Sequence, residues 1–224
     1  MQILLLRVGI DLGTGGALGP IFPNRSFEYI PIPESKPSPR SVRYSDIIAR
    51  SGGTLDRFVP PRHCGTAAHF DPEFETFTYG DPTKNKRGQL LRLRKDDLLV
   101  FYAGLRPPGQ SNGSVLYLIG FFTVACVYDV SDTQPWPPSD LRRLWANAHF
   151  RRNAPDEGLV VVQGVRDGSR LLERAVQLSD DHQNILPELY DTLGLEGSIK
   201  RSGAGRWVPD HRVRRAAEWI LSHL

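Results

Sequence analysis

Cysteine is scarce in this sequence of 224 residues, which contains only Cys64 and Cys126 and no CxxC pair. Two cysteines make at most one bridge, so the sequence excludes both a zinc ribbon and a disulfide-rich secreted scaffold. A chain of this length buries roughly 70% of its surface on folding and needs neither disulfides nor a structural metal to hold a core. We therefore expect one domain that spans residues 1–224.

Long apolar runs are absent as well. The longest stretch, residues 115–128, contains Gly120, Thr123 and Cys126, and it is shorter than the roughly 20 residues that span a bilayer. Residues 1–8 are apolar, but they lack a basic flank and a small-residue cleavage site, and a glycine turn follows them directly. These features predict a cytoplasmic protein that has no membrane partner.

Lysine is rare, because the 28 basic residues comprise 5 lysines and 23 arginines. Arginine offers a planar fork that binds phosphates and base edges, whereas lysine acts as a point charge. A GC-rich genome would also encode arginine in preference to lysine. The net charge of +3 is too small to identify a nucleic-acid-binding protein by itself.

Apolar and β-branched runs predict a sheet. Residues 2–8 form one expected strand. Residues 98–105 and 115–127 are expected to be adjacent antiparallel strands, because a polar, turn-forming loop at residues 107–113 joins them. Further strands are expected at residues 27–30, at residues 159–165 and at residues 171–178, the last two joined by a hairpin turn at Asp167-Gly168.

Helices are fewer. One is expected over residues 139–150, with Ser139 or Asp140 as its cap, and another from Asp210 to the end of the sequence. Residues 35–90 show little periodicity apart from a short helical stretch near residues 44–50, so they are a candidate for a mobile, ligand-facing excursion. Together these elements predict an α+β fold: a β-rich, curved or barrel-like mixed sheet with two or three peripheral helices.

A glycine-rich loop follows the first strand. Val8-Gly9-Ile10-Asp11-Leu12-Gly13-Thr14 matches the first phosphate loop of actin-like and sugar-kinase ATPases, in which backbone N–H groups cradle phosphate. That superfamily needs two related α/β halves and a second Asp-Gly-Gly loop, which this chain lacks. A nucleotide-dependent phosphotransferase that uses residues 9–16 is therefore kept as a second alternative.

Two further groups carry ionisable or aromatic side chains. His63, Cys64, His69 and Asp71 lie within nine residues, and they favour an ordinary turn over a metal site because the spacing is irregular. Aromatic and basic residues that suit stacking on a base and holding its phosphate form the second group: Tyr102, Arg106, Trp145, His149, Arg151, Arg152 and Trp207.

Several short motifs resemble the nucleotide modification associated domain family, third type, whose members are proposed DNA base-modification proteins of phages and bacteria. They are Leu5-Leu6-Arg7-Val8-Gly9-Ile10-Asp11, residues 19–23 with Ser26, Pro31-Ile32-Pro33-Glu34, and residues 69–74. The strands at residues 97–102 and 118–124 are also similar to PUA-like modules such as the ASCH and EVE domains, whose small barrel holds a modified or flipped base. One departure is Ala68, which stands where a cysteine is expected before His69.

The resemblance implies a nucleobase pocket and a partner that is nucleic acid, DNA rather than RNA, or a nucleotide. The expected activity is DNA base modification, with a non-catalytic reader of modified bases as the alternative. No cofactor is indicated and no metal is expected. We expect Arg7, Asp11, His69 and Asp71 to converge on one cleft. The resemblance implies these site residues: Asp71, His69 and Asp11 for catalysis, and Arg7, Tyr102, Arg106, His149 and Trp207 for nucleic-acid binding.

Overall fold

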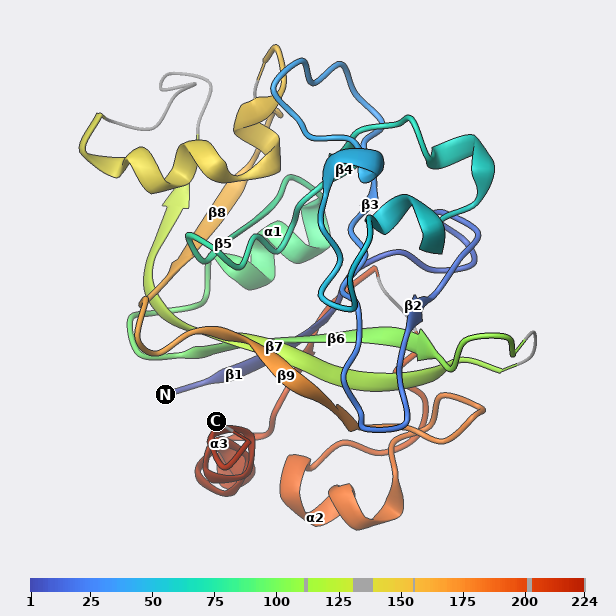
Figure 1. Ribbon diagram of the computed structural model, residues 1–224. Helices are drawn as coiled ribbons and strands as arrows, with labels where there is room; N and C mark the ends of the chain where they lie inside the picture. Colours follow the sequence, from blue (N-terminus) through green and yellow to red (C-terminus); the bar gives the residue numbers. More distant parts are fainter. Residues whose placement is uncertain (111–112, 131–138, 155, 201–202, 224) are drawn as a thin grey trace.

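A computed structural model describes residues 1–110, 113–130, 139–154, 156–200 and 203–223. Its centre is the antiparallel pair of β6 (Leu98–Arg106) and β7 (Val115–Asp129), in register from Leu98 opposite Thr123 to Leu105 opposite Val115. β1 (Ile3–Arg7) runs parallel to β6 along its other edge. The predicted first strand and the predicted central pair are thus confirmed (Figure 1).

The described strands extend this centre into a mixed sheet of order β10-β1-β6-β7-β8-β5, with β2 beside β6 and β9 beside β7. The expected α+β class is confirmed, but the sheet is not closed into a barrel, because β10 and β5 end the order and do not pair with each other. The added strands are β2 (Gly19–Pro20), β5 (Thr78–Asp81), β8 (Val160–Gly164), β9 (Arg170–Gln177) and β10 (Arg206–Trp207).

The expected hairpin at Asp167-Gly168 is wrong, although both of its strands exist. β8 pairs with the second half of β7 and β9 pairs with the first half, so neither is a ladder partner of the other. The length of β7 explains this, because a strand of 15 residues is long enough for β8 to pair with one half and β9 with the other. The strand expected at residues 27–30 is also wrong: Phe27 makes a single bridge to Ile21, and Pro31 beyond it has no N–H to donate to a ladder.

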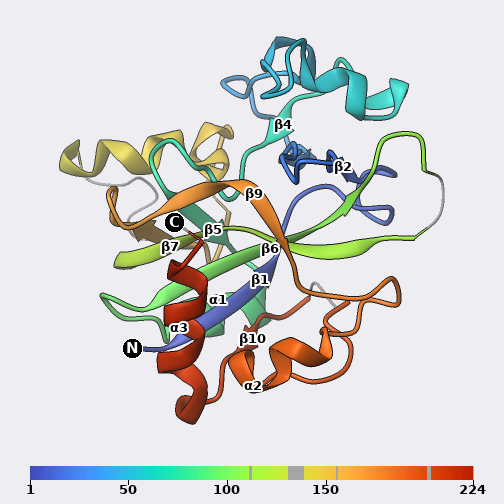
Figure 2. The same ribbon diagram turned by 60° about the horizontal axis from the view of Figure 1, so that its bottom comes forward.

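Helices α2 (Tyr190–Leu193) and α3 (Val213–Leu221) lie on the side of the sheet opposite β3 (Ile32–Pro33) and β4 (Ala68–His69) (Figures 1 and 2). The expected C-terminal helix is confirmed. Asp210 does not cap it, because a 3-10 turn at Asp210–Arg212 precedes the helix and no side chain bonds to its first N–H groups. Within the described residues, no helix has the length and apolar character that crossing a membrane requires.

The helix expected over residues 139–150 is divided into two 3-10 helices, Ser139–Ala146 and Ala148–Arg151. Asn147 interrupts them, because its side chain accepts a hydrogen bond from the backbone N–H of His149 and starts the second helix. The side chains of Ser139 and Asp140, the expected caps, lie outside the described residues. The helical stretch near residues 44–50 is a single 3-10 turn, Tyr44–Asp46.

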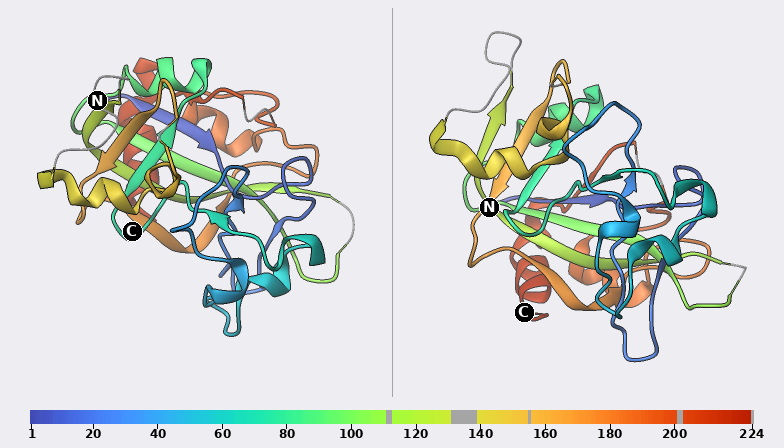
Figure 3. Two further views of the ribbon diagram at one scale, coloured as in Figure 1. Left: turned by 90° about the horizontal axis from the view of Figure 1, so that it is seen from above. Right: turned by 45° about the horizontal axis from the view of Figure 1, so that its top comes forward.

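Residues 35–90 contain more regular structure than their sequence indicates. They include β4, which pairs with β3, and also β5 of the main sheet and helix α1 (Lys84–Leu90). The part before β4 contributes to a small apolar cluster separate from the main core, and Figure 3 shows its loops and short turns to one side of the main sheet. That cluster contains Ile10, Ile30, Tyr44, Ala49, Leu55, Val59 and Ala68. The mobility of this segment stays a prediction.

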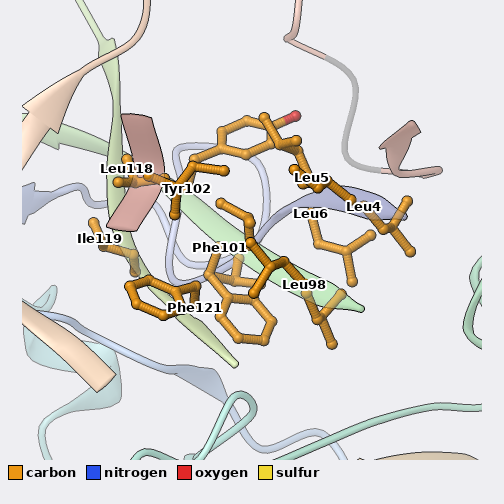
Figure 4. Close-up of a cluster of buried hydrophobic side chains, with 14 of the residues drawn as sticks. Leu4, Leu5, Leu6, Leu98, Phe101, Tyr102, Leu118, Ile119 and Phe121 are labelled. Atoms are coloured by element: carbon orange, nitrogen blue, oxygen red, sulfur yellow. The ribbon is translucent and has the colours of Figure 1, made fainter. Parts of the chain in front are cut away.

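The main core surrounds β6, which is buried on both faces. Every side chain from Leu98 to Leu105 is at most 4% exposed. Phe101 contacts Phe74 and Phe122 edge to face, and Tyr102 lies among leucines of β1 and β7 (Figure 4). Burial of this apolar surface is the main force that holds β1, β6 and β7 together and so fixes the end of β1, where the candidate site begins.

Candidate functional site

A cavity of about 160 Å³ opens where β1, β4 and β5 meet Ala148–Arg151, the second of the two 3-10 helices that flank Asn147. A cavity of about 150 Å³ is enough for a benzene-sized ring, so this one has room for one six-membered ring. Its lining is mostly polar: Arg7, Asp11, Thr14, His69, Asp71, Tyr79, Asp81, Lys86 and His149, with Val8, Gly9, Ile32 and Gly80. The predicted convergence of Arg7, Asp11, His69 and Asp71 on one cleft is therefore observed.

Asp71 follows β4 by two residues and is fixed by two other segments. Its Oδ1 accepts hydrogen bonds from the backbone N–H of Gly80 at 2.8 Å and from Nδ2 of Asn147 at 3.0 Å. Its Oδ2 lies 3.5 Å from Nε2 of His149. One carboxylate oxygen of Asp71 thus binds the backbone of β5, and the other faces His149.

His149 is buried, with a side chain 5% exposed. Its Nδ1 lies 2.5 Å from Oδ2 of Asp156, and its Nε2 lies 3.2 Å from the carbonyl oxygen of Gly80. A Cβ at position 80 would lie 2.8 Å from Cδ2 of His149. Glycine at this position is therefore what allows the imidazole to pack against β5.

His69 is held in a matching way from the opposite side. Its Nδ1 lies 2.8 Å from Oε2 of Glu34, and its ring meets that of His149 edge to face with centroids 4.8 Å apart. Arg152 lies between the two histidines and donates to Glu34 through Nη2 at 2.8 Å and to Asp156 through Nη1. Each histidine therefore directs Nδ1 at a buried carboxylate that Arg152 also binds.

Charge is concentrated in this cluster, and it shifts the pKa values of its members. Burial alone would lower the pKa of His149, but hydrogen bonds to Asp156 and Asp71 raise it to about 9, so the imidazole is protonated at neutral pH. Burial alone would raise the pKa of Glu34, but hydrogen bonds from His69 and Arg152 lower it to about 2. Lys36, which also binds Asp156, completes the set of charged partners.

The other wall of the cavity carries two separate ion pairs. Arg7 Nη2 lies 3.6 Å from Oδ2 of Asp11, and Lys86 Nζ lies 3.0 Å from Oδ2 of Asp81. Asp11 also accepts hydrogen bonds from the backbone N–H groups of Gly13 and Thr14. These N–H groups are the ones a phosphate would need, so the internal bonding of the loop disfavours the phosphotransferase alternative.

Three residues expected at the site lie away from the cavity. Tyr102 is fully buried, and its hydroxyl donates to the carbonyl oxygen of Ile199 at 3.0 Å. Arg106 donates from Nε to the carbonyl oxygen of Gly113, within the loop after β6. Trp207 lies on β10, where the Arg92 guanidinium stacks 4.9 Å from its ring centroid. None of the three lines the cavity.

Glu34, Gly80, Asn147 and Asp156 are parts of the site that the sequence did not single out as site residues. Glu34 stands in a motif that resembles the family, but nothing near it indicates a histidine partner 35 positions away. Asp156 follows Arg152 by four residues, a spacing that indicates a local ion pair. Arg152 belongs to the aromatic and basic group that suits binding of a base and its phosphate, whereas in the structure it is 7% exposed and forms buried ion pairs.

Comparison with protein families identifies the family of the chain. Residues 2–221 match the family described as "Nucleotide modification associated domain 3", so the resemblance noted in the sequence holds over nearly the whole chain. No curated protein and no solved structure matches the chain. The similarity to PUA-like modules finds no support in these comparisons, and the open sheet lacks the barrel that such a module has.

Proposed function

Because the chain belongs to the nucleotide modification associated domain 3 family, we propose that it is an enzyme that modifies a nucleobase of DNA in the cavity beside Asp71. The observation that carries this proposal is the buried set of His69, Asp71 and His149, brought together from separate segments. Buried ionised groups cost free energy and contribute little to stability, so a cluster of buried ionisable groups in a cleft is a candidate functional site. A flipped base is the substrate that a cavity of ring size can receive.

Asp71 is the proton acceptor in this proposal. Gly80 and Asn147 occupy Oδ1 and fix the carboxylate, so Oδ2 takes the proton from the base or from a water beside it. The protonated His149, 3.5 Å from Oδ2, stabilises the negative charge that develops on the base or the water as it loses the proton. Arg7 and Asp11, at the opposite wall, recognise the polar edge of the base.

A non-catalytic reader is the alternative, and the lining of the cavity disfavours it. A reader of an exposed base typically stacks it on aromatic side chains. The aromatic residues expected to do so, Tyr102 and Trp207, lie elsewhere, and Tyr79, which lines the cavity together with the two histidines, is 2% exposed. The site therefore offers ionisable groups in place of a stacking platform.

A second surface is evidence that the substrate is a polynucleotide and not a free nucleotide. A groove of about 1180 Å³ is lined by four exposed arginines, Arg25, Arg166, Arg170 and Arg174, together with Asp167 and Glu173. None of the four arginines forms an ion pair with a carboxylate among the described residues. Unpaired guanidinium groups at this density suit the phosphates of a nucleic-acid backbone.

Mass spectrometry of nucleosides tests the proposal. DNA and RNA from cells that express the chain are digested and compared with those from cells that lack it. We expect a nucleoside of altered mass in the DNA fraction alone. A new nucleoside in RNA alone would overturn the choice of DNA, and identical profiles in both fractions would overturn the enzyme and leave the reader.

A further inference from the structure

We propose that His69, Asp71 and His149 bind one divalent transition-metal cation at the wall of the cavity. One ligand atom from each of the three residues lies within 4.8 Å of the other two. The ligands come from β4, from the loop after it and from the second 3-10 helix, so the fold and not local spacing brings them together. The sequence alone disfavoured a metal because it showed His69 and Asp71 without their third partner.

The hydrogen bonds of the two histidines are those of metal-binding imidazoles. A histidine that binds a metal usually donates its other ring N–H to a carboxylate, which fixes the tautomer and the ring orientation. Nδ1 of His69 faces Glu34 at 2.8 Å, and Nδ1 of His149 faces Asp156 at 2.5 Å. Nε2 is therefore the nitrogen of each ring that would bind a cation, and Nε2 of His149 would exchange its contact with the carbonyl oxygen of Gly80, 3.2 Å away, for the metal.

Asp71 supplies the third ligand through Oδ2, since Oδ1 is already bonded to Gly80 and Asn147. Two ligands at about 2.1 Å from a tetrahedral metal lie about 3.4 Å apart. Oδ2 of Asp71 and Nε2 of His149 are 3.5 Å apart, which matches the separation expected of two ligands on one metal. The 4.8 Å limit for the full set exceeds this spacing, so binding would draw the three ligand atoms closer together.

Charge in the cluster favours a cation. A cation displaces the proton from Nε2 of His149, and with both imidazoles then neutral the cluster contains the carboxylates of Glu34, Asp71 and Asp156 and two other cations, Arg152 and Lys36. The remaining carboxylates of the lining are already balanced by their own partners, Arg7 and Lys86. A divalent cation held by Asp71 would compensate the excess negative charge.

The donor set selects the kind of cation. Two imidazoles and one carboxylate suit Zn²⁺, Fe²⁺, Co²⁺ and related ions, whereas Ca²⁺ and Mg²⁺ prefer oxygen ligands. Three protein ligands leave coordination positions open toward the cavity, as in catalytic and not in structural metal sites. What the cation does there rests on the proposed function: Asp71 becomes its ligand, and a water on the cation, after losing a proton to solvent, would replace Oδ2 as proton acceptor in its hydroxide form.

Titration with Co²⁺ tests the site without any nucleic acid. The full chain is treated with a chelator, dialysed and titrated with CoCl₂, with binding followed by calorimetry and by the visible absorption of the bound ion. We expect one Co²⁺ per chain, displaced by Zn²⁺. Asp71→Asn and His149→Ala should each weaken binding at least tenfold, and Glu34→Gln, which alters the carboxylate shared by His69 and Arg152 and no metal ligand, should weaken it about 10- to 100-fold.

His182→Ala is the matched control, because this histidine also faces an aspartate, Asp181, but is 81% exposed. Its affinity should equal that of the unaltered chain. Circular dichroism identifies any variant that fails to fold. Asp71→Asn is the variant expected to fold, because its amide oxygen can still accept the hydrogen bonds from Gly80 and Asn147. Absent binding, or equal binding by the unaltered chain, Asp71→Asn and Glu34→Gln, would overturn the site. Base modification by a metal-free protein would overturn the part of the cation in the reaction, and Co²⁺ binding without base modification would overturn only the proposed function.

Discussion

Nε2 of His149 lies 3.5 Å from Oδ2 of Asp71, although the two residues come from a 3-10 helix and from the loop after β4. Asn147 and Gly80 maintain this relationship. Asn147 starts the helix of His149 and also donates to Asp71, and Gly80 gives its N–H to Asp71 and its carbonyl oxygen to His149. The position of the pair is therefore determined by β5 and by the second 3-10 helix together.

Gly80→Ala is expected to disrupt the site while leaving the fold intact. The added Cβ would lie 2.8 Å from Cδ2 of His149, a distance that forces the buried ring to move. We expect a loss of about 1–3 kcal/mol in the free energy of unfolding, as for other overpacked cores, together with loss of modified nucleoside. Urea denaturation and nucleoside mass spectrometry measure the two effects.

Gly88→Ala is the control for that variant. Gly88 lies in α1, and a Cβ there meets nothing within 4 Å. Alanine is the better helix former by up to about 1 kcal/mol, so Gly88→Ala should be as stable as the unaltered chain or more so, with full yield of modified nucleoside. If Gly80→Ala behaves like Gly88→Ala, the packing of His149 against β5 is not important for the reaction.

Tyr102→Phe tests whether Tyr102 is structural. The variant loses the hydrogen bond to Ile199, so we expect it to lose about 1 kcal/mol of stability at pH 7 and to bind oligonucleotides as the unaltered chain does. Burial raises the pKa of Tyr102 to about 12, against a smaller lowering by Arg7 and Arg206.

The sign of the pH effect follows from that shift. The unfolded chain loses the Tyr102 proton near pH 10 and the folded chain only near pH 12, so the unaltered chain loses stability relative to Tyr102→Phe as the pH rises between these values. Denaturation at pH 7, 10 and 11.5 measures the difference. Weakened oligonucleotide binding with no change in stability would contradict the structural role and show that Tyr102 takes part in binding.

Salt dependence tests the arginine groove. Each phosphate contact contributes about −0.9 to the slope of log affinity against log salt for duplex DNA, so Arg170→Ala and Arg174→Ala should each make the slope shallower by about that amount. Arg214→Ala is the control, because Arg214 is exposed on α3 but paired with Glu218. Equal slopes for all the variants would exclude the groove as the phosphate-binding surface. The same titration of Arg106→Ala tests the contact that the sequence predicted there.

The sequence predicted the centre of the fold because the signals there are local. The apolar runs of β1, β6 and β7 and the apolar spacing of α3 all identify elements that the structure contains. The pairing of the strands was harder to predict, because β8 and β9 both pair with β7, each along a different half of it. Nothing in the turn Asp167-Gly168 distinguishes that arrangement from a hairpin.

The site was predicted in part. Arg7, Asp11, His69 and Asp71 carry motifs that resemble the family, and all four line the cavity. Tyr102 was misplaced because β6 is buried on both faces, so no alternation of polar and apolar residues shows which way its side chains point. Glu34 and Asp156 gave no local signal, because each acts through a histidine that only the fold brings near.

One paired measurement on Asp71→Asn tests the central claim, that the cavity beside Asp71 is where a base is modified. The variant keeps the shape of the side chain and an acceptor for Gly80, but it removes the proton acceptor or metal ligand. We expect the yield of modified nucleoside to fall by about 10² to 10⁴, while oligonucleotide affinity stays within about tenfold, or 1.4 kcal/mol. Full yield with retained binding would contradict the account, because the modification would then take place without Asp71.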